Sequence, residues 1–326
     1  MNRRNIVGVG VASLVMSASL RVPAQQPPRV WRIGVLAPSS TGGARQILAG
    51  LSTALRERGY DERSIKLDVR AADSDANRLR EFAEDLVAVT PDIILAVSPS
   101  AIIAARRETK TIPVVMTFWG GPGLLESGVI QSFARPGTNV TGIYMLGTEI
   151  NQKRMQLLLL AVPNAHRVAM LDPGGATATY LAELRAVTDA AKVELFASDV
   201  PEPNGYDRVF EALAKARTDA VLIGFARFYA DQAQIISAAA KYRLPAMYDW
   251  GDQARGGGMM GYGPVGSELW RRTVAYIDRI LKGADPASLP VEQPTRFELV
   301  INLKAAKALG AKIPQSLLLQ ADEVIE

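Results

Sequence analysis

Short apolar segments alternate with amphipathic segments along most of the chain. In the first half, the apolar segments are rich in β-branched residues and occupy residues 31–37, 65–71, 92–97, 113–118 and 140–145. Between them, apolar residues recur at spacings of three and four, as in the stripe formed by Ile47, Leu48, Leu51 and Leu55. Continuous apolar runs are typical of buried parallel strands, and each parallel pair needs a crossover connection. The pattern therefore predicts an open βαβ unit of about five strands.

The same alternation starts again after a long helical segment at residues 149–162. Strands are predicted at residues 167–171, 193–197, 219–224, 245–248 and 259–262, with helices at 180–191, 206–216 and 231–242. The fold class is therefore α/β, with two consecutive units. The connection between them, at residues 143–147, is short and extended.

The last part of the chain adds a helix, a strand and a second short helix. Leu269, Val274 and Ile277 belong to a helix that ends at Lys282-Gly283, a basic last turn followed by a glycine. Residues 289–294 are extended, residues 297–303 are predicted to form a strand, and residues 304–309 a helix ended by Gly310. Because two units are already complete, we expect these pieces to pack back onto them, with more than one chain crossing.

Residues 1–24 have the layout of a secretory signal. Arg3 and Arg4 precede an apolar run at residues 6–20, and Val22-Pro23-Ala24 places small residues around a cleavage site. The run is shorter than the about 20 residues that a membrane span needs. We expect export to the periplasm with cleavage near Ala24, by the general or the twin-arginine route. An uncleaved anchor is the alternative.

Composition excludes several classes of protein. The 326-residue chain has no cysteine, which excludes disulfides, thiolate nucleophiles, cysteine-ligated metals and a lipid-anchored cysteine. Without residues 1–24, which carry three arginines and no acid, the formal net charge falls from +4 to +1. A nearly neutral chain without runs of like charge gives no indication of a nucleic-acid partner.

The sequence gives little support for an enzyme. His166 is the single histidine and precedes a predicted strand, at the end of the unit opposite its carboxyl edge. No Gly-x-Ser-x-Gly motif is present, and Gly256-Gly257-Gly258 lacks the strand and the lysine of a phosphate-binding loop. We therefore expect no catalysis, no metal and no cofactor. A hydrolase that uses only carboxylates remains an open alternative.

Candidate ligand contacts follow the predicted strands, because open parallel sheets bind ligands at the carboxyl ends of their strands. Hydroxyl residues before helices suit a carboxylate, aromatic rings suit an apolar body, and an aspartate suits an ammonium group. The candidate residues are Ser39, Ser40, Thr41, Asp73, Ser98, Ser100, Trp119, Tyr144, Phe225, Asp249, Trp250 and Tyr262. Together they indicate a small amphipathic, amino acid-like solute. The alternatives are that the serines only cap helices, that Trp119 and Trp250 pack in cores, and that Asp249 is an ordinary surface residue.

A resemblance to a known family rests on long stretches of sequence. The densest runs over residues 280–310, from Ile-Leu-Lys-Gly-Ala-Asp-Pro to Lys-Ala-Leu-Gly, and continues through Ile313-Pro314 to residues 321–326. Residues 135–142, Arg-Pro-Gly-Thr-Asn-Val-Thr-Gly, and Gly257-Gly258 before Tyr262-Gly263 are equally typical. From about residue 28 to its end, the chain resembles the substrate-binding proteins of ABC transporters that include tryptophan- and tyrosine-binding components.

The resemblance implies a type I periplasmic-binding fold, in which hinge crossings join two Rossmann-like lobes and the ligand lies between them. It implies a first lobe of residues 29–143 plus 264–287 and a second of residues 144–263 plus 288–326. We expect a monomer whose partners are a small-molecule ligand and a membrane permease; a ligand sensor for a receptor is the alternative. Two departures bear on the ligand. The family's Asp-Pro is missing near Gly120–Leu124, and Gly251-Asp252 stands where relatives often have Arg-Glu.

Overall fold

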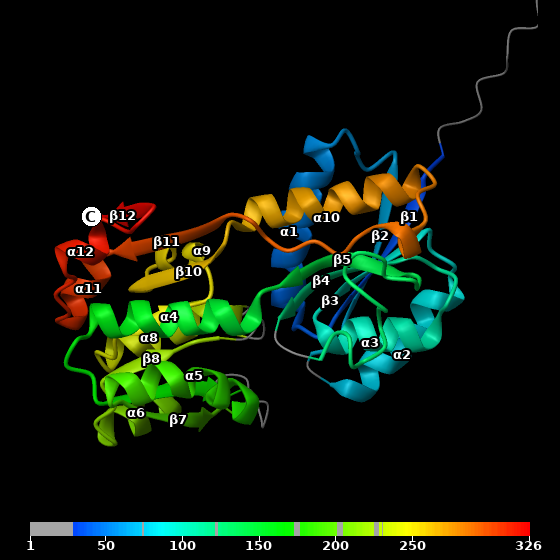
Figure 1. Cartoon of the computed structure of the whole chain (residues 1–326). Helices are drawn as coiled ribbons and strands as arrows, with labels where there is room; N and C mark the ends of the chain where they lie inside the picture. The colour runs from blue at the N-terminus through cyan, green and yellow to red at the C-terminus, as the bar shows by residue number, and fades with distance from the viewer. Residues whose placement is uncertain are drawn as a thin grey trace, which may run out of the picture.

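Two lobes lie side by side and are joined by extended crossings (Figure 1). The computed structural model describes residues 29–73, 75–120, 123–172, 177–200, 205–224, 228–229 and 231–326. The predicted secretory signal lies outside these residues. Each lobe has its own sheet with helices on both faces, which confirms the predicted α/β fold of two lobes with parallel sheets.

The first lobe is built on a parallel sheet with the strand order β2-β1-β3-β4-β5. Its strands are β1 (Trp31–Ala37), β2 (Ile65–Ala71), β3 (Ile93–Val97), β4 (Val114–Gly120) and β5 (Val140–Met145). The crossovers are α1 (Thr41–Glu57), α2 (Ala76–Ala88) and α3 (Pro99–Glu108). All five predicted strands of this unit are confirmed. Every residue of β3 is buried, as a continuous apolar run in the middle of a covered sheet requires.

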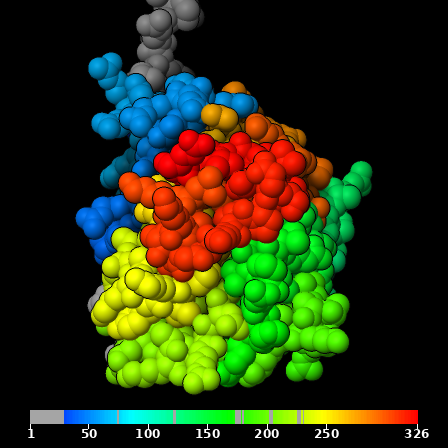
Figure 2. Space-filling model, turned by 90° about the vertical axis from the view of Figure 1, so that its left-hand side faces the viewer, coloured from blue at the N-terminus to red at the C-terminus, as the bar shows by residue number. Residues whose placement is uncertain are grey.

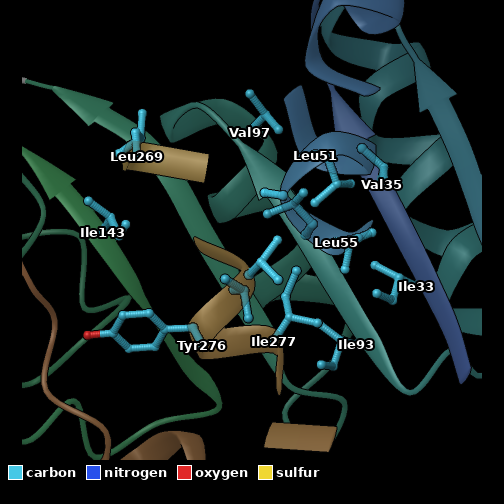
Figure 3. Packing of buried hydrophobic residues seen from close by; sticks show 14 of the residues in the cluster. Ile33, Val35, Leu51, Leu55, Ile93, Val97, Ile143, Leu269, Tyr276 and Ile277 are labelled. Carbon is cyan, nitrogen blue, oxygen red and sulfur yellow. The ribbon is translucent and has the colours of Figure 1, made fainter. Parts of the chain in front are cut away.

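A helix from the last quarter of the chain completes the core of the first lobe. Helix α10 (Gly266–Leu281) packs beside α1, and Leu269, Tyr276 and Ile277 join Ile33 and Leu51 in one buried cluster (Figure 3). Helices α2 and α3 contribute to a second cluster, which includes Leu36, Ile94 and Met116 of the sheet. Segments more than 200 residues apart in the sequence therefore share one core. The buried apolar residues of α10 form a single stripe along the helix, which faces this core.

The second lobe contains a mixed sheet with the order β12-β11-β10-β9-β8-β6-β7 in the described residues. Its strands are β6 (Arg167–Asp172), β7 (Glu194–Asp199), β8 (Ala220–Leu222), β9 (Ala246–Tyr248), β10 (Met260–Pro264), β11 (Phe297–Asn302) and β12 (Glu323–Ile325). Its helices are α4 (Gly147–Ala161), α5 (Thr177–Ala191), α6 (Tyr206–Lys215), α8 (Gln232–Lys241), α9 (Gly251–Arg255), α11 (Leu303–Leu309) and α12 (Gln315–Leu318).

Strand β11 runs antiparallel to β10, and this direction was not predicted. The chain enters β11 directly from the third crossing between the lobes. A parallel strand would need a crossover helix on this sheet before it, and the described chain has none there. The short elements α9, α12 and β12 were also not predicted. Figure 2 shows the C-terminal segment, in red, covering one end of the second lobe, where Leu317 joins the cluster of Leu157 and Leu158 from α4.

The described chain passes between the lobes at three places, near residues 145–147, 264–266 and 289–296. The third crossing lies beside β5: the Tyr144 amide donates to the Glu292 carbonyl oxygen at 2.9 Å, and the Glu292 amide to that of Gly142 at 3.1 Å. The second and third crossings also pair, because the Val265 amide donates to the Arg296 carbonyl oxygen at 3.2 Å. The crossings therefore form one hydrogen-bonded hinge.

A bulge near the end of β4 changes the direction of its last residues. The register with β5 shifts between Met116 and Trp119, and Phe118 between them has a φ of 60°. Opposite the bulge, Gly142 has a φ of 136°, and a Cβ atom there would overlap the Met116 carbonyl oxygen. This close approach requires glycine. The close approach therefore explains why the motif at residues 135–142 ends in glycine.

Candidate functional site

The candidate site lies where the carboxyl ends of the two sets of parallel strands meet. Phe118, near the end of β4, and Trp250, directly after β9, bring their ring centroids to 5.6 Å. In open α/β sheets the loops that follow neighbouring strands lie at the same edge, so the loops after the other strands are expected there as well. We call this region the interlobe site.

Ser98 and Ser100 place hydroxyl groups at the beginning of α3. Their Oγ atoms are 3.2 Å apart, and Ser98 has a φ of 86°, an uncommon conformation for a residue with a side chain. No side-chain hydrogen bond caps this helix. Its first amide groups and its positive dipole end are therefore available to an anion, which suits the predicted carboxylate.

Two further hydroxyl groups of the first lobe are buried without a hydrogen-bond partner among the described residues. They are Ser39 Oγ, which follows β1, and Thr117 Oγ1, near the end of β4. Thr117 is completely inaccessible to solvent. A buried hydroxyl without a hydrogen bond costs about 1–3 kcal/mol. Both hydroxyls, at the edge of the first sheet close to Ser98, can therefore still form a hydrogen bond. Sequence reasoning missed Thr117, because it lies inside a predicted strand.

The other first-lobe candidates make local contacts in the structure. Ser40 is the N-cap of α1 and accepts a hydrogen bond from the Gly43 amide at 3.3 Å. Asp73 forms an ion pair of 3.0 Å with Arg78, and both side chains are exposed. Thr41 is exposed in the first turn of α1. Ser40 therefore caps a helix, as the alternative interpretation of the serines predicted. Contact of Ser40, Thr41 and Asp73 with ligand stays a prediction.

Trp119 and Tyr144 are neighbours across β4 and β5. Trp119 is only 3% exposed and packs in the second core cluster of the first lobe, while its Nε1 atom has no acceptor among the described residues. Tyr144 is partly exposed and lies edge-to-face with Phe133 at 5.1 Å. Burial raises the pKa of Tyr144, and the charges of Glu149 and Glu183 raise it further. Its hydroxyl therefore stays protonated at the hinge.

Arg154 organises the second-lobe side of the interlobe site. From the middle of α4, its Nη2 donates to the Asp249 carbonyl oxygen at 2.8 Å and its Nε to that of Tyr262 at 2.7 Å. Its Nη1 donates to Asn151 Oδ1 at 2.8 Å and lies 3.7 Å from Asp249 Oδ1. Burial lowers the pKa of Arg154, and the charge of Asp249 opposes this shift. One buried cation therefore fixes the ends of β9 and β10.

Arg154 was not among the residues predicted from the sequence, although its position in the helix gives a signal. It occupies a buried position between Ile150 and Leu157 on the apolar side of α4, where a charged residue needs a partner. Tyr180 on α5 was also missed. Burial raises its pKa to about 12, and the charges of Glu183 and Asp249 contribute. The Tyr180 hydroxyl therefore stays protonated, and the charge of Asp249 acts on it.

The remaining candidates differ in their surroundings. Trp250 is 8% exposed, and its ring lies 6.2 Å from that of Tyr229 in addition to its contact with Phe118. Tyr262 stacks on Phe297 of β11 at 6.0 Å, so its ring packs within the second lobe. Phe225 lies outside the described residues. Tyr229 and Trp270 were not expected at the site, whereas the strand end that carries Phe118 and Trp119 was. The left-handed backbone of Phe118 costs about 1–3 kcal/mol, a type of strain that is common at ligand sites.

The described residues contain no group of three or more histidine, cysteine, aspartate or glutamate side chains that could hold a metal ion. Within the same residues, no helix combines the length and the apolar character that a membrane span requires. The arrangement that is present suits binding: hydroxyls and a helix N-terminus on one side, and a carboxylate, a phenol and aromatic rings on the other.

Comparison with known proteins gives a consistent result. Residues 32–325 match a family described as ABC transporter substrate binding protein. The structure of an ABC domain in complex with L-Trp from Streptococcus pneumonia is 25% identical, with a TM-score of 0.79 over 91% of this chain and 100% of that chain. A conserved domain protein from Vibrio cholerae, 24% identical with the same coverage and a TM-score of 0.79, shares the fold. A tyrosine-binding protein from Clostridioides difficile is 23% identical over 266 residues, 80% of this chain and 75% of that protein.

Proposed function

The chain belongs to the ABC transporter substrate-binding protein family, and we propose that it is the exported solute-binding component of an importer. Its ligand is a small amphipathic solute, an amino acid or a similar molecule, and aromatic amino acids are the first candidates. The observation that carries this proposal is that the uncapped N-terminus of α3, with Ser98 and Ser100, follows the strand next to β4, whose Phe118 ring meets that of Trp250, the residue after Asp249.

Charge and shape support an amino acid-like ligand. A carboxylate fits the amide groups and hydroxyls at the start of α3, and an ammonium group fits the acidic side of the second lobe around Asp249. The comparisons agree with this choice, since one similar structure contains L-Trp and one similar protein is named for binding tyrosine. The two departures from the family pattern, at Gly120–Leu124 and Gly251-Asp252, follow β4 and β9 in the sequence, the strands that carry Phe118 and precede Trp250.

The mechanism is capture by closure of the lobes. We assign residues 29–143 plus 264–287 to the first lobe and residues 144–263 plus 288–326 to the second. Ligand binds to one lobe, the hinge formed by the three crossings bends, and the second lobe completes the site. Ligand shifts this equilibrium only by its differential affinity for the closed form. The closed monomer then presents a surface from both lobes to a membrane permease, and the solute is released unchanged.

Export fits this role. Residues 1–24 supply the secretory signal, and the mature protein starting at Gln25 acts in the periplasm.

A thermal-shift screen of the mature chain tests the proposal. Amino acids, short-chain acids, sugars and purines are added singly, and each hit is followed by calorimetry and by chemical analysis of the recovered solute. A ligand at 100 times its Kd should stabilise the protein by about 2.7 kcal/mol. Binding of L-tryptophan, L-tyrosine or another amino acid, recovered intact, supports the proposal. Binding only of sugars or purines would refute the amino acid assignment, and a consumed solute would show an enzyme.

A further inference from the structure

A cavity of about 250 Å³ lies in the second lobe between α8 and α11, which contact each other. Each helix contributes three residues at spacings of three and four, which share one helix face: Ile236, Ala239 and Ala240 of α8, and Ala305, Ala308 and Leu309 of α11. Because four of these six residues are alanines, the two helices leave space between them. We call this space the α8–α11 cavity.

The α8–α11 cavity is separate from the interlobe site. Its floor includes Ala246, the first residue of β9, and Met259, directly before β10, so it lies over the starts of these strands and not over their carboxyl ends. Figure 1 shows α11 at the end of the second lobe that points away from the first lobe. A molecule in this cavity would therefore not contact a solute held between the lobes.

Tyr248 lines the floor of the cavity with a buried side chain. The residue is 1% exposed, and its hydroxyl group forms no hydrogen bond with the described residues. Burial raises the pKa of Tyr248, so the group stays a protonated donor. The ring lies against the backbone at Gly258, where a Cβ atom would be 2.6 Å from it. Since buried polar groups almost always have a partner, this hydroxyl is suited to a molecule bound in the cavity.

Lys304 places a positive charge at the rim of the cavity. It is exposed, and it forms no ion pair with a carboxylate of the described residues. Asn302 in the wall is already used, because it accepts from the Ala305 amide at 2.9 Å and donates to the Ala254 carbonyl oxygen at 3.1 Å. None of the described residues that line the cavity is acidic. The charge and the free donor therefore both favour an anion.

We propose that the α8–α11 cavity is a second binding site, for a small amphipathic carboxylate whose apolar body has about the size of an aromatic ring. The alanine-rich walls take the apolar body, while the carboxylate oxygens accept from the Tyr248 hydroxyl and the Lys304 ammonium group. An apolar cavity of about 150 Å³ takes up benzene, so the larger volume here leaves room for a ring with a short side chain. An ammonium group would find no acidic partner, which separates this ligand from the amino acid proposed for the interlobe site.

Calorimetric titration with phenylpropionate tests the second site. Lys304→Met should weaken binding by about tenfold, through loss of a hydrogen bond to a charged group. Phenylpropanol, which has the same ring and no charge, should bind the Lys304→Met variant and the unchanged protein equally. Ala305→Leu fills the cavity and should abolish binding of both compounds. Ala308→Leu, at the exposed rim, serves the same purpose if Ala305→Leu does not fold, as judged by circular dichroism.

Matched controls separate the cavity from surface charge and from the interlobe site. Lys307→Met removes an exposed cation of α11 that does not line the cavity, and it should leave the affinity for phenylpropionate unchanged. Ser100→Ala in the interlobe site should also leave it unchanged. Tyr248→Phe keeps the ring and should weaken binding by about fivefold, the effect of one hydrogen bond.

Each contrary outcome would overturn the second site. Phenylpropionate that does not bind, or that binds the Ala305→Leu and Lys304→Met variants normally, would exclude the cavity. Loss of binding in Ser100→Ala, with normal binding in Ala305→Leu, would place the acid between the lobes. Equal weakening by Lys304→Met and Lys307→Met would show attraction to surface charge only. A dimer in sedimentation that Ala305→Leu abolishes would show that a second copy of the chain occupies the cavity.

The second site goes beyond the proposed function and is tested independently of it. The variants on α11 lie outside the interlobe site, and the probe is not an amino acid. A screen without any amino acid hit therefore counts against the proposed solute and leaves the result on the α8–α11 cavity intact.

Discussion

Arg154 and Asp249 are 95 residues apart in the chain and form a buried contact in which the Arg154 Nη2 donates to the Asp249 carbonyl oxygen at 2.8 Å. The Asp249 carboxylate lies 3.7 Å from the same guanidinium group. The cation from the first helix after the hinge therefore fixes both the backbone and the charge of a residue at the proposed ammonium side of the interlobe site. Support of this kind is expected around a binding residue that must be held in one orientation.

Replacing Arg154 by methionine should destabilise the protein by about 3–5 kcal/mol. The substitution keeps the length and apolar character of the side chain, but it leaves two buried carbonyl oxygens and the Asp249 carboxylate without their cation. Urea unfolding followed by circular dichroism measures the loss. The control is Lys153→Met, a partly exposed cation on the same helix, which should change stability by less than about 0.5 kcal/mol. Equal effects of the two substitutions would contradict the role given to Arg154.

Gly142→Ala should destabilise the protein more than Gly59→Ala. Both glycines have a positive φ, 136° and 91°, so alanine is strained at either position, by about 1–2 kcal/mol. At Gly142 the added methyl group would also overlap the Met116 carbonyl oxygen, whereas nothing lies within 4 Å at Gly59. The difference between the two variants in chemical unfolding therefore measures the close approach at the β4 bulge. A smaller effect at Gly142 than at Gly59 would mean that the bulge yields.

Asp278 should make stability depend on pH in the acid range. It accepts hydrogen bonds from Tyr60 at 2.7 Å and from Arg58 and Lys282 at 3.0 Å, and it joins α10 to the end of α1. Burial alone would raise the pKa of Asp278, but the hydrogen bonds from Lys282, Tyr60 and Arg58 outweigh it and lower this pKa to about 2. The folded state therefore holds the charged form more strongly than the unfolded chain does.

The sign of the effect follows from that lowered pKa. The stabilisation is complete above the pKa of the unfolded carboxyl, about 4, and is lost as the pH falls through about 2. Because the side chains of Arg58 and Lys282 are 47% and 70% exposed, solvent screens these pairs and we expect about 1–2 kcal/mol. The difference in unfolding free energy between the unchanged protein and Asp278→Asn should be constant from pH 7 to pH 5 and disappear near pH 2. A difference that grows on acidification would be inconsistent with this assignment.

Ser100→Ala should weaken binding of the amino acid found in the screen by about tenfold, the loss of one hydrogen bond of about 1.4 kcal/mol to a charged group. Thermal stability without ligand should stay nearly unchanged, because Ser100 is exposed and its hydroxyl forms a hydrogen bond with the neighbouring Ser98 hydroxyl at 3.2 Å. Calorimetric titration gives the affinity. Ser316→Ala, at an exposed serine of α12 on the second lobe, is the control. Unchanged affinity in Ser100→Ala would remove the start of α3 from the proposed site.

Most strands and helices of both lobes could be predicted from the sequence, because each forms from a local pattern of apolar and polar residues. The apolar runs of β1 to β5 and the stripes of α1 and α10 reflect periods that any short window contains. The position of the site at the carboxyl edges followed from the same pattern, since the topology of parallel sheets places successive loops together. Ser98 and Ser100 became candidates for this reason.

Contacts between distant segments could not be predicted in this way. The direction of β11 depends on the crossing that precedes it, Arg154 depends on strand ends about 100 residues later, and the partner of Trp250 lies in the other lobe. Trp119 and Trp250 illustrate the limit: their places after strands were predicted, while their burial against protein was decided by neighbours from other segments. The sequence by itself determined most of the elements, their order and the edge of the sheets at which we expect a ligand. Tertiary structure decided which side chains meet there, because burial and ion pairing depend on distances that only the folded chain defines.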